Sequence, residues 1–460
     1  MSQLDALTAR AAELRAKLGT EVHLGVAEAT FAEAARLAGD SVKRRGRVFD
    51  WDWKLDRVLT SKIWGFPIML GILAVVFWLT IKGANVPSGL LADGLFWVED
   101  QLAFAFQSAG APVWLEGFLV HGIFRGLAWV ISVMLPPMMI FFPVFTLLED
   151  LGYLPRVAFN LDRMFKSAGG NGKQALTHTM GFGCNAAGVI ATRIIQSPRE
   201  RLIAIITNNF APCNGRWPTL IMLATVFVAA AFPADIGSII AASTLVGIVM
   251  FGILVALLVS GALSRTVLKG EPSAFALELP PYRKPQVLRV IYTSIIDRTL
   301  FVLWRAIVWA IPCGAVAWIM GNVYVGDLSV MAHVSGFLDP FGHALGLDGV
   351  ILLAYIIAIP ANEIVVPTML MAYMNVDRMI EIDNMADLKT LLVVHNEWTL
   401  LTAICLMLFS LLHNPCSTTI WTIYKETGSK KWTWVATLLP LAIAFVVCFL
   451  VATIWRAVGG

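Results

Sequence analysis

The residues of this sequence with the clearest chemical potential are cysteines that stand beside helix-breaking or polar residues in apolar stretches. Cys184 follows two glycines, Gly181 and Gly183, and precedes Asn185. Glycine admits close backbone approach, so Gly181 and Gly183 are assigned a structural role. Cys184 offers a soft ligand and Asn185 an amide oxygen. A helix-packing glycine motif around a small hydrophobic cysteine explains the pattern equally well, so both interpretations stay open.

A second group of polar residues interrupts the bilayer-length apolar run 202–232. It contains three asparagines, a proline, a cysteine and an arginine: Asn208, Asn209, Pro212, Cys213, Asn214 and Arg216. Such groups are costly in a bilayer unless they face a cavity, and a proline removes a helix donor and disrupts the turn before it. A purely structural kink does not need so many polar side chains. We therefore predict a broken helix in which Asn209, Cys213 and Asn214 face a transport pathway.

Two similar sites follow in the second half of the chain. Asn362 and Glu363 stand in an otherwise apolar segment, and carboxylates within a membrane usually lie on ion or substrate pathways. A hairpin tip in water is the alternative for Glu363. Pro415 and Cys416 interrupt a later apolar run, where neighbouring serine and threonine can also satisfy the backbone that the proline frees. Cys416 gains weight because it mirrors Cys213.

These positions together provide thiols, amide oxygens and one carboxylate. Hard ions such as magnesium and calcium prefer all-oxygen sites, whereas thiols favour softer transition metals. A borderline ion such as ferrous iron fits the mixture, and we assign its ligands to Cys184, Cys213, Glu363 and Cys416. Iron is then a substrate, and no resident cofactor or catalytic residue is expected.

Other candidate donors fit a structural role better. Packing is the expected role of three cysteines within apolar spans and of four methionines that could add transient thioether contacts: Cys313, Cys405, Cys448, Met180, Met369, Met371 and Met374. Five histidines form no ligand spacing: His121, His178, His333, His343 and His395. The segment 169–174 lacks the first glycine and the hydroxyl of a phosphate-binding loop, so no nucleotide-binding residue is assigned.

The composition places all of these residues in a membrane protein. Of 460 residues, 58% are hydrophobic and 14% charged, whereas soluble domains are nearer 45–50% apolar and about 25% charged. A soluble multi-domain enzyme is therefore excluded. The net charge of +3 is too small to indicate a nucleic-acid partner. Six cysteines without a C-x-x-C pair indicate neither a zinc site nor a disulfide framework.

The elements that must position these residues are mostly membrane spans. Residues 1–62 differ, because they contain two polar or amphipathic helices (4–17 and 29–45) and a basic, aromatic stretch, with no apolar core of a signal peptide. Since Lys and Arg collect on the cytoplasmic side, we place the N-terminus inside the cytoplasmic membrane. Spans are predicted at 63–81, 127–148, 202–232, 236–263, 299–320, 388–424 and 432–454, and re-entrant hairpins near 175–194 and 350–373.

An internal repeat relates the two halves. Six residues recur 177 positions later within 25 ungapped positions: Leu161, Asp162, Gly169, Gly172, Leu176 and Asn185 match Leu338, Asp339, Gly346, Gly349, Leu353 and Asn362. The charges around the copies are opposite in character. Residues 149–201 contain seven Lys or Arg, whereas 306–377 contain none in 72 residues. The first hairpin therefore opens to the cytoplasm and the second to the outside, which predicts an inverted repeat and hence a transporter with its site near the midplane.

Several motifs resemble one known family. From about residue 56 to the C-terminus the chain is similar to the membrane region of the ferrous iron transport protein B (FeoB) family, on these segments: 148–153 with Arg156, 181–185, 198–201, Cys213 with Arg216 and Pro218, 362–366, and 415–416 with 426–429. The resemblance implies two Gate-type (nucleoside-recognition-like) domains and ferrous iron uptake. It also implies that Cys184, Cys213 and Cys416 match the family's proposed metal-pathway residues, and that Glu363 belongs to the second gate.

The sequence departs from the family pattern in two ways. Family members usually begin with a GTPase domain and a helical coupling domain, whereas here only the N-terminal helices look like the end of the coupling domain. Residues 212–215 replace the usual Ser-Cys-Gly-Ala, and Asn362 replaces the usual Lys. The first departure concerns energy coupling and the second concerns metal selectivity.

The resulting prediction is an all-α polytopic membrane protein with two inverted Gate-type repeats, each with a re-entrant hairpin and a broken helix. Its parts are a cytosolic helical segment (1–62), a first transmembrane helix with an external amphipathic connection (63–126), a first repeat (127–265), a cytosolic basic linker (266–298) and a second repeat (299–460). The expected partners are lipids, a separate soluble GTPase docking on 1–62, and a small FeoA-like accessory protein, and a homo-oligomer is compatible with this organisation.

Two other functions are weighed against ferrous iron transport. The first is a cotransporter for a nucleoside or another small organic solute, because Gate-type domains resemble those of nucleoside carriers. Asparagine and glutamate at hairpin tips suit hydroxyls and bases, but clustered cysteines do not. The second is a scaffold or regulatory subunit without transport activity, which leaves the polar residues inside the spans unexplained.

Overall fold

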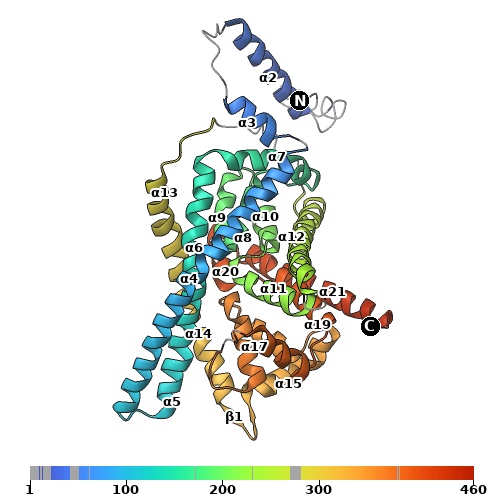
Figure 1. Cartoon of the computed structure of the whole chain (residues 1–460). Helices are drawn as coiled ribbons and strands as arrows, with labels where there is room; N and C mark the ends of the chain where they lie inside the picture. Colours follow the sequence, from blue (N-terminus) through green and yellow to red (C-terminus); the bar gives the residue numbers. More distant parts are fainter. Residues whose placement is uncertain are drawn as a thin grey trace, which may run out of the picture.

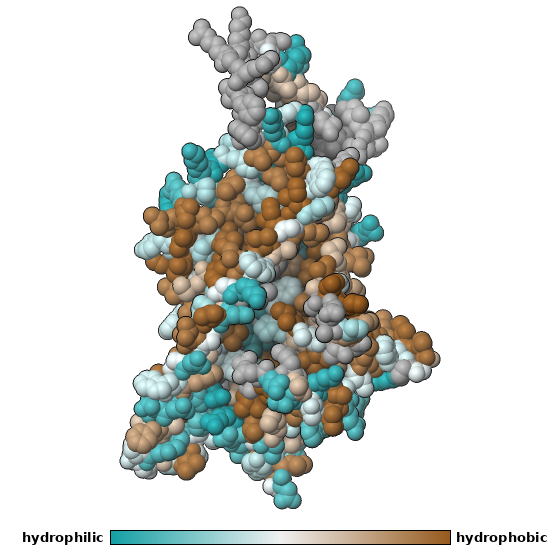
Figure 2. Space-filling view, in the orientation of Figure 1, coloured by the Kyte–Doolittle hydropathy of each residue, from teal (hydrophilic) through white to brown (hydrophobic). Residues whose placement is uncertain are grey.

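The computed structural model is a bundle of helices (Figure 1). It describes residues 10, 13, 22–41, 51–61, 63–170, 172–229, 232–269, 281–380, 382 and 384–459. Strands in this part of the chain are limited to a small hairpin of β1 (Tyr324–Val325) and β2 (Leu328–Ser329). Six of the helices are long and apolar enough to cross a membrane, or seven if one bent helix pair counts as a span. An apolar band covers the middle of the molecule and hydrophilic residues gather at its lower end (Figure 2). The chain is a multi-pass membrane protein.

The N-terminal part contains α2 (Val22–Ser41), α3 (Trp51–Leu59) and the 44-residue helix α4 (Gly65–Ser108). The predicted first helix at 4–17 and the basic residues at 43–47 lie outside the described residues. α4 runs well past the predicted end of the first span at 81 and includes Pro87 within the helix. At 1.5 Å per residue α4 is about 66 Å long, roughly twice the hydrocarbon thickness. Much of the predicted external connection is therefore a continuation of this helix.

Close packing of glycines joins α4's partner helices to the second half of the chain. After α5 (Val113–Glu116), the π-helix η1 (Gly117–Phe124) leads into α6 (Arg125–Asp150). α6 and η1 pack on α14 (Phe301–Asn322), which follows α13 (Val287–Thr293) and the π-helix η7 (Ser294–Leu300). A Cβ atom on Gly126 would lie 3.0 Å from the Cα of Gly314. Small residues of this kind let two membrane helices approach closely.

The first half of the chain contains the predicted hairpin and broken helix. α7 (Tyr153–Ser167) precedes the hairpin of α8 (Lys173–Gly183) and α9 (Asn185–Ala191), which is broken at Cys184. After η2 (Thr192–Ile194), the broken helix consists of α10 (Pro198–Thr207), η3 (Asn208–Phe210), η4 (Asn214–Arg216), α11 (Trp217–Leu223) and η5 (Ala224–Val228), and α12 (Ala234–Arg265) follows. The polar residues of the sequence pattern thus coincide with the places where the helices stop.

The second half repeats this order. α15 (Val330–Ala344) is followed by the hairpin of α16 (Gly349–Ile357), η8 (Asn362–Ile364) and α17 (Val365–Met374). α18 (Met385–Lys389) and η9 (Thr390–His395) lead to the broken helix of α19 (Leu400–Leu412) and α20 (Ser417–Thr427), and α21 (Lys430–Ala457) ends the described chain.

The two copies share a local hydrogen bond that explains the conserved spacing between them. Oδ1 of Asp162 accepts from the backbone N–H of Gly172 at 3.0 Å, and Oδ1 of Asp339 accepts from that of Gly349 at 2.9 Å. The glycines that begin both connections, Gly169 and Gly346, have φ of 72° and 73°, which only glycine adopts at little cost. α7 and α15 lie at opposite ends of the molecule (Figure 1). The opposite orientation of the two copies in a bilayer stays a prediction.

Three segments meet at the end of the molecule that carries α7. Arg156 of α7 is buried and binds Asp56 of α3 through two bonds, Nε–Oδ1 at 2.9 Å and Nη2–Oδ2 at 3.1 Å. The hydroxyl of Tyr282, at the far end of the predicted linker, donates to Asp56 Oδ1 at 2.8 Å, and its ring faces the Arg156 guanidinium. Residues 270–280 of that linker lie outside the described residues. Asp56 therefore ties the N-terminal segment to the first repeat.

We expect the substitution Asp56→Asn to weaken this junction in a pH-dependent way. Burial raises the pKa of Asp56, but the hydrogen bonds from Arg156 and Tyr282 outweigh burial and hold it below its ordinary value. A carboxylate with a lowered pKa in the folded state stabilises the fold above its ordinary pKa of about 3.9, and this contribution is lost as the pH falls through the lower, folded-state value. At pH 7 the variant should lose about 1 kcal/mol of unfolding free energy.

The measurement is unfolding of the detergent-purified protein by denaturant at pH 7 and pH 3. The difference between the parent and Asp56→Asn should shrink at pH 3, because Asp56 becomes protonated in both states. The exposed Asp100→Asn on α4 is the matched control and should be neutral at both values. An equal loss at both pH values would contradict the assignment.

Candidate metal-transport site

The two hairpins and the two broken helices meet around one small cavity. Its volume is about 30 Å³. Each of the four breaks contributes polar residues, and α6 and the start of α14 complete the wall. The lining residues are Met134, Met138, Gly183, Cys184, Asn185, Cys213, Asn214, Gly215, Val302, Ala306, Pro360, Ala361, Asn362, Glu363, Cys416 and Thr418. All four predicted metal ligands and three of the four predicted pathway asparagines are among them.

Each of the three cysteines occupies the same position in its local structure. Cys184 is the N-cap of α9, Cys213 that of η4 and Cys416 that of α20. Their sulfurs face backbone N–H groups of the turn that follows, at Ala186 and Ala187, at Gly215, and at Thr419, respectively. The N-terminus of a helix favours negative charge and is a common setting for reactive thiolates. The fold therefore presents three thiols in a form suited to binding a cation.

The carboxylate of Glu363 reaches across from the second hairpin to the first broken helix. A Cβ atom built on Gly215 would lie 2.5 Å from Glu363 Cδ. Such an approach leaves no room for any side chain at Gly215. The single acidic group of the cavity is thus held directly beside the turn that carries Cys213.

Arg216 lies behind the cavity and binds the two broken helices together. Its side chain is buried, and Nη1 donates to the carbonyls of Asn209 and Leu411, both at 2.8 Å. Nη2 donates to Asn209 Oδ1 at 3.2 Å and to the carbonyls of His413 at 3.1 Å and Asn414 at 3.3 Å. These oxygens lie at the carbonyl ends of α10–η3 and α19, and a helix C-terminus favours a cation.

Asn209 belongs to this joint rather than to the cavity wall. Its Nδ2 donates to the His413 carbonyl at 2.7 Å, and its Oδ1 accepts from Arg216. The other structural residues also lie at the breaks: Gly181 packs against Asn208, Gly183 against Phe141, and Pro212 and Pro415 are buried beside Cys213 and Cys416.

Two residues of the wall were missed by the sequence analysis. Met134 and Met138 lie one turn apart on α6, are buried, and line the cavity, whereas the methionines considered from the sequence do not line it. The signal was their spacing of four residues on a predicted span. Met138 also borders a smaller cavity of about 10 Å³ that reaches Thr80 of α4 and Trp217 of α11.

The donors are distributed around the wall rather than gathered at a point. Within the part of the chain that the structure describes, no three His, Cys, Asp or Glu side chains are close enough together to hold a metal ion. Tight structural metal sites usually have four protein ligands in fixed geometry. A cavity with dispersed donors is better suited to an ion that moves from one ligand to the next.

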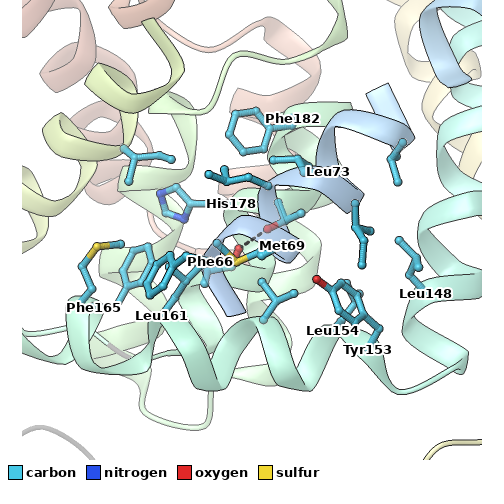
Figure 3. Close-up of a pocket in the computed structure, with 18 of the residues that line it drawn as sticks. Phe66, Met69, Leu73, Leu148, Tyr153, Leu154, Leu161, Phe165, His178 and Phe182 are labelled. Atoms are coloured by element: carbon cyan, nitrogen blue, oxygen red, sulfur yellow. Dashed lines mark hydrogen bonds between the residues drawn. The ribbon is translucent and has the colours of Figure 1, made fainter. Parts of the chain in front are cut away.

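A larger cavity of about 310 Å³ lies elsewhere, between α4, α7, α8 and α12 (Figure 3). Its wall is almost entirely apolar, with Phe66, Met69 and Leu161 among its side chains. His178 borders it, but both ring nitrogens face backbone carbonyls, Nδ1 that of Gln174 at 2.9 Å and Nε2 that of Thr207 at 3.1 Å. This cavity offers no donor set for an ion.

Comparison with known proteins agrees with this architecture. A family model described as "Nucleoside recognition" (Gate) matches residues 131–227 and 303–430. A second model, "Ferrous iron transport protein B C terminus", matches 245–297. The fold and site are therefore those of a Gate-type membrane protein. No solved structure matches the chain.

Curated relatives give the family. A Staphylococcus aureus protein named "Fe(2+) transporter FeoB" is 30% identical over 86% of this chain and 58% of its own length. Proteins of the same name from Campylobacter jejuni and Methanocaldococcus jannaschii are both 26% identical, over 86% and 96% of this chain and 64% of their own lengths. The chain thus spans about 60% of these relatives. It belongs to the ferrous iron transport protein B family and corresponds to its membrane region.

Proposed function

We propose that this chain transports ferrous iron across the cytoplasmic membrane, as a transporter rather than an enzyme. The observation that carries the proposal is the meeting of four helix breaks, with three thiols and one carboxylate, around a single cavity. Fe²⁺ is the substrate and passes between thiolate and oxygen donors at Cys184, Cys213, Glu363 and Cys416. The names of the relatives support the choice of iron.

The size of the cavity argues against a nucleoside as the substrate. A water molecule needs about 10–15 Å³ of such volume, so a cavity of about 30 Å³ has room for a partly hydrated ion. A nucleoside is several times larger. The name of the Gate model describes nucleoside recognition, but the thiols of this chain suit a metal.

The orientation and regulation of the protein are part of the same proposal. The seven basic residues of 149–201 favour a cytoplasmic position for the end of the molecule that carries α7, and with it for the N-terminal segment. GTP would act through a separate GTPase docking on residues 1–62. A FeoA-like accessory protein is supported by a Porphyromonas gingivalis relative named as a fusion of Fe(2+) transport protein A with FeoB, 27% identical to this chain.

Iron uptake by proteoliposomes tests the proposal. With an inward Fe²⁺ gradient, Cys213→Ser and Cys416→Ser should each reduce the initial rate by about tenfold or more, because a hard hydroxyl replaces a soft ligand. Cys313→Ser is the matched control, because this buried thiol donates to the Ile357 carbonyl outside the cavity. Parent-like rates in both cavity variants would refute the pathway, and competition by uridine instead of Fe²⁺ would select the nucleoside alternative.

A further inference from the structure

The strongest unassigned feature of the cavity is a pair of asparagines related by the internal repeat. Asn185 and Asn362 are 177 residues apart and occupy equivalent positions, each directly after the break of its hairpin. Both are buried and both line the cavity. Each amide has one oxygen and one nitrogen end, so its hydrogen-bond partners decide which end the cavity receives.

The surroundings of Asn185 fix its amide with the nitrogen turned away from the cavity. In this orientation Nδ2 donates to the Ala211 carbonyl at 3.2 Å and to the Gly181 carbonyl at 3.1 Å. In the reverse orientation Oδ1 would face these two carbonyls, and Nδ2 would have only Asn209 Oδ1 at 3.5 Å. Two good donors outweigh one long contact, because a buried amide is costly when an acceptor faces acceptors. Oδ1 is then the end available to the cavity.

The imidazole of His413 decides the orientation of Asn362. His413 Nδ1 lies 2.9 Å from the Ser410 carbonyl and 3.1 Å from the Phe409 carbonyl, so Nδ1 carries the proton. The neutral ring then has a bare lone pair on Nε2, which lies 3.2 Å from one terminal atom of the Asn362 amide. That atom must be Nδ2, because only the nitrogen can donate to the lone pair. A doubly protonated ring would place a second cation beside the buried Arg216, which donates to the His413 carbonyl.

The oxygen of Asn362 consequently faces Cys213. The other terminal atom of the amide lies 3.9 Å from Cys213 Sγ. The imidazole is itself held by aromatic neighbours, with Tyr355 at 4.8 Å and Phe409 at 5.9 Å between ring centroids. A histidine whose Nδ1 is fixed by a backbone carbonyl has a defined tautomer and ring orientation. His413 is therefore a positioning residue for Asn362.

We propose that Oδ1 of Asn185 and Oδ1 of Asn362 form a pair of ligands for the transported divalent cation, oriented by the Gly181 and Ala211 carbonyls and by His413 Nε2. This inference rests on the proposed function, and it adds a ligand class to the thiols. Neutral oxygens suit harder ions such as Mn²⁺ and Fe²⁺, whereas thiolates alone favour softer ones. The amide pair thus sets metal selectivity.

The test measures binding of Mn²⁺ and of Zn²⁺ to the purified full chain in detergent. Asn362→Ala and His413→Asn should each weaken Mn²⁺ binding about tenfold and Zn²⁺ binding by no more than about threefold. His413→Gln places an acceptor near the position of Nε2 and should stay within about threefold of the parent. Because His413 acts through Asn362, the double variant should bind Mn²⁺ no more weakly than Asn362→Ala alone.

Asn185→Ala provides an independent arm, since it leaves His413 and Asn362 in place, and it should show the same selective loss of Mn²⁺. Equal losses for both metals, or additive effects of Asn362→Ala and His413→Asn, would overturn the inference. A parent that binds both metals, with variants whose Mn²⁺-to-Zn²⁺ ratio is unchanged, overturns the amide pair but not iron transport. A parent that binds neither metal overturns both.

Discussion

Replacing Arg216 by methionine should separate the two broken helices and destabilise the protein strongly. The guanidinium is buried and supplies donors to four backbone carbonyls and one amide oxygen, which come from residues about 200 positions apart. Methionine fills much of the volume but donates nothing. Each buried acceptor left without a donor costs about 1–3 kcal/mol. Even if relaxation satisfies most of them, the loss should exceed about 3 kcal/mol.

Thermal unfolding of the purified protein in detergent measures this loss. Arg216→Lys should be intermediate, because a single ammonium cannot reach all of these oxygens in the fork geometry of a guanidinium. Arg193→Met is the matched control: Arg193 is largely exposed and pairs with Glu426, so its loss should cost less than about 1 kcal/mol. An Arg216→Met protein that unfolds with the parent would show that the breaks are held by other contacts.

Placing one methyl group at Gly215 should disable transport while the protein stays folded. A Cβ atom there would lie 2.5 Å from Glu363 Cδ, so the carboxylate must leave its position beside Cys213. The cavity has only about 30 Å³, and a methyl group uses a large part of it. Gly215→Ala should therefore reduce Fe²⁺ uptake by about tenfold or more, with an unfolding cost limited to about 1–3 kcal/mol of overpacking.

Two further variants make this result specific. Gly247→Ala on α12 adds the same methyl group where no atom lies within 4 Å, and it should transport like the parent. Glu363→Gln keeps the volume and removes the charge, so it should share the transport defect without the overpacking. If Gly215→Ala transports at the parental rate, the position of Glu363 is not needed for the pathway.

The sequence predicted those features of the fold that depend on local chemistry. Proline and glycine end helices wherever they occur, and polar residues in apolar runs need a cavity, so the breaks at Cys184, Cys213 and Cys416 could be located from neighbouring residues alone. The 177-residue repeat could be found because both copies need the same aspartate–glycine contact. Pro87 misled the analysis, because α4 continues through it as membrane helices can.

The missing part of the site depends on contacts between distant segments. Nothing near Arg216 in the sequence indicates that its partners are the carbonyls of 411, 413 and 414. His413 could not be separated from the other histidines, since its role depends on Asn362 across the cavity. Met134 and Met138 share α6 with many apolar residues, and only the packing of four other segments shows which face of that helix meets the thiols.

The junction at Asp56 gives the N-terminal segment a mechanical connection to the thiols. Asp56 grips α7 through Arg156, and Asp162 of the same helix holds the backbone at Gly172, where α8 starts. α8 ends at Gly183, next to Cys184. A load applied to residues 51–61 is passed along two polar contacts and two helices to the first hairpin. The membrane domain therefore has a handle on its surface, and whatever grasps that handle can pull on one wall of the cavity without entering the bilayer.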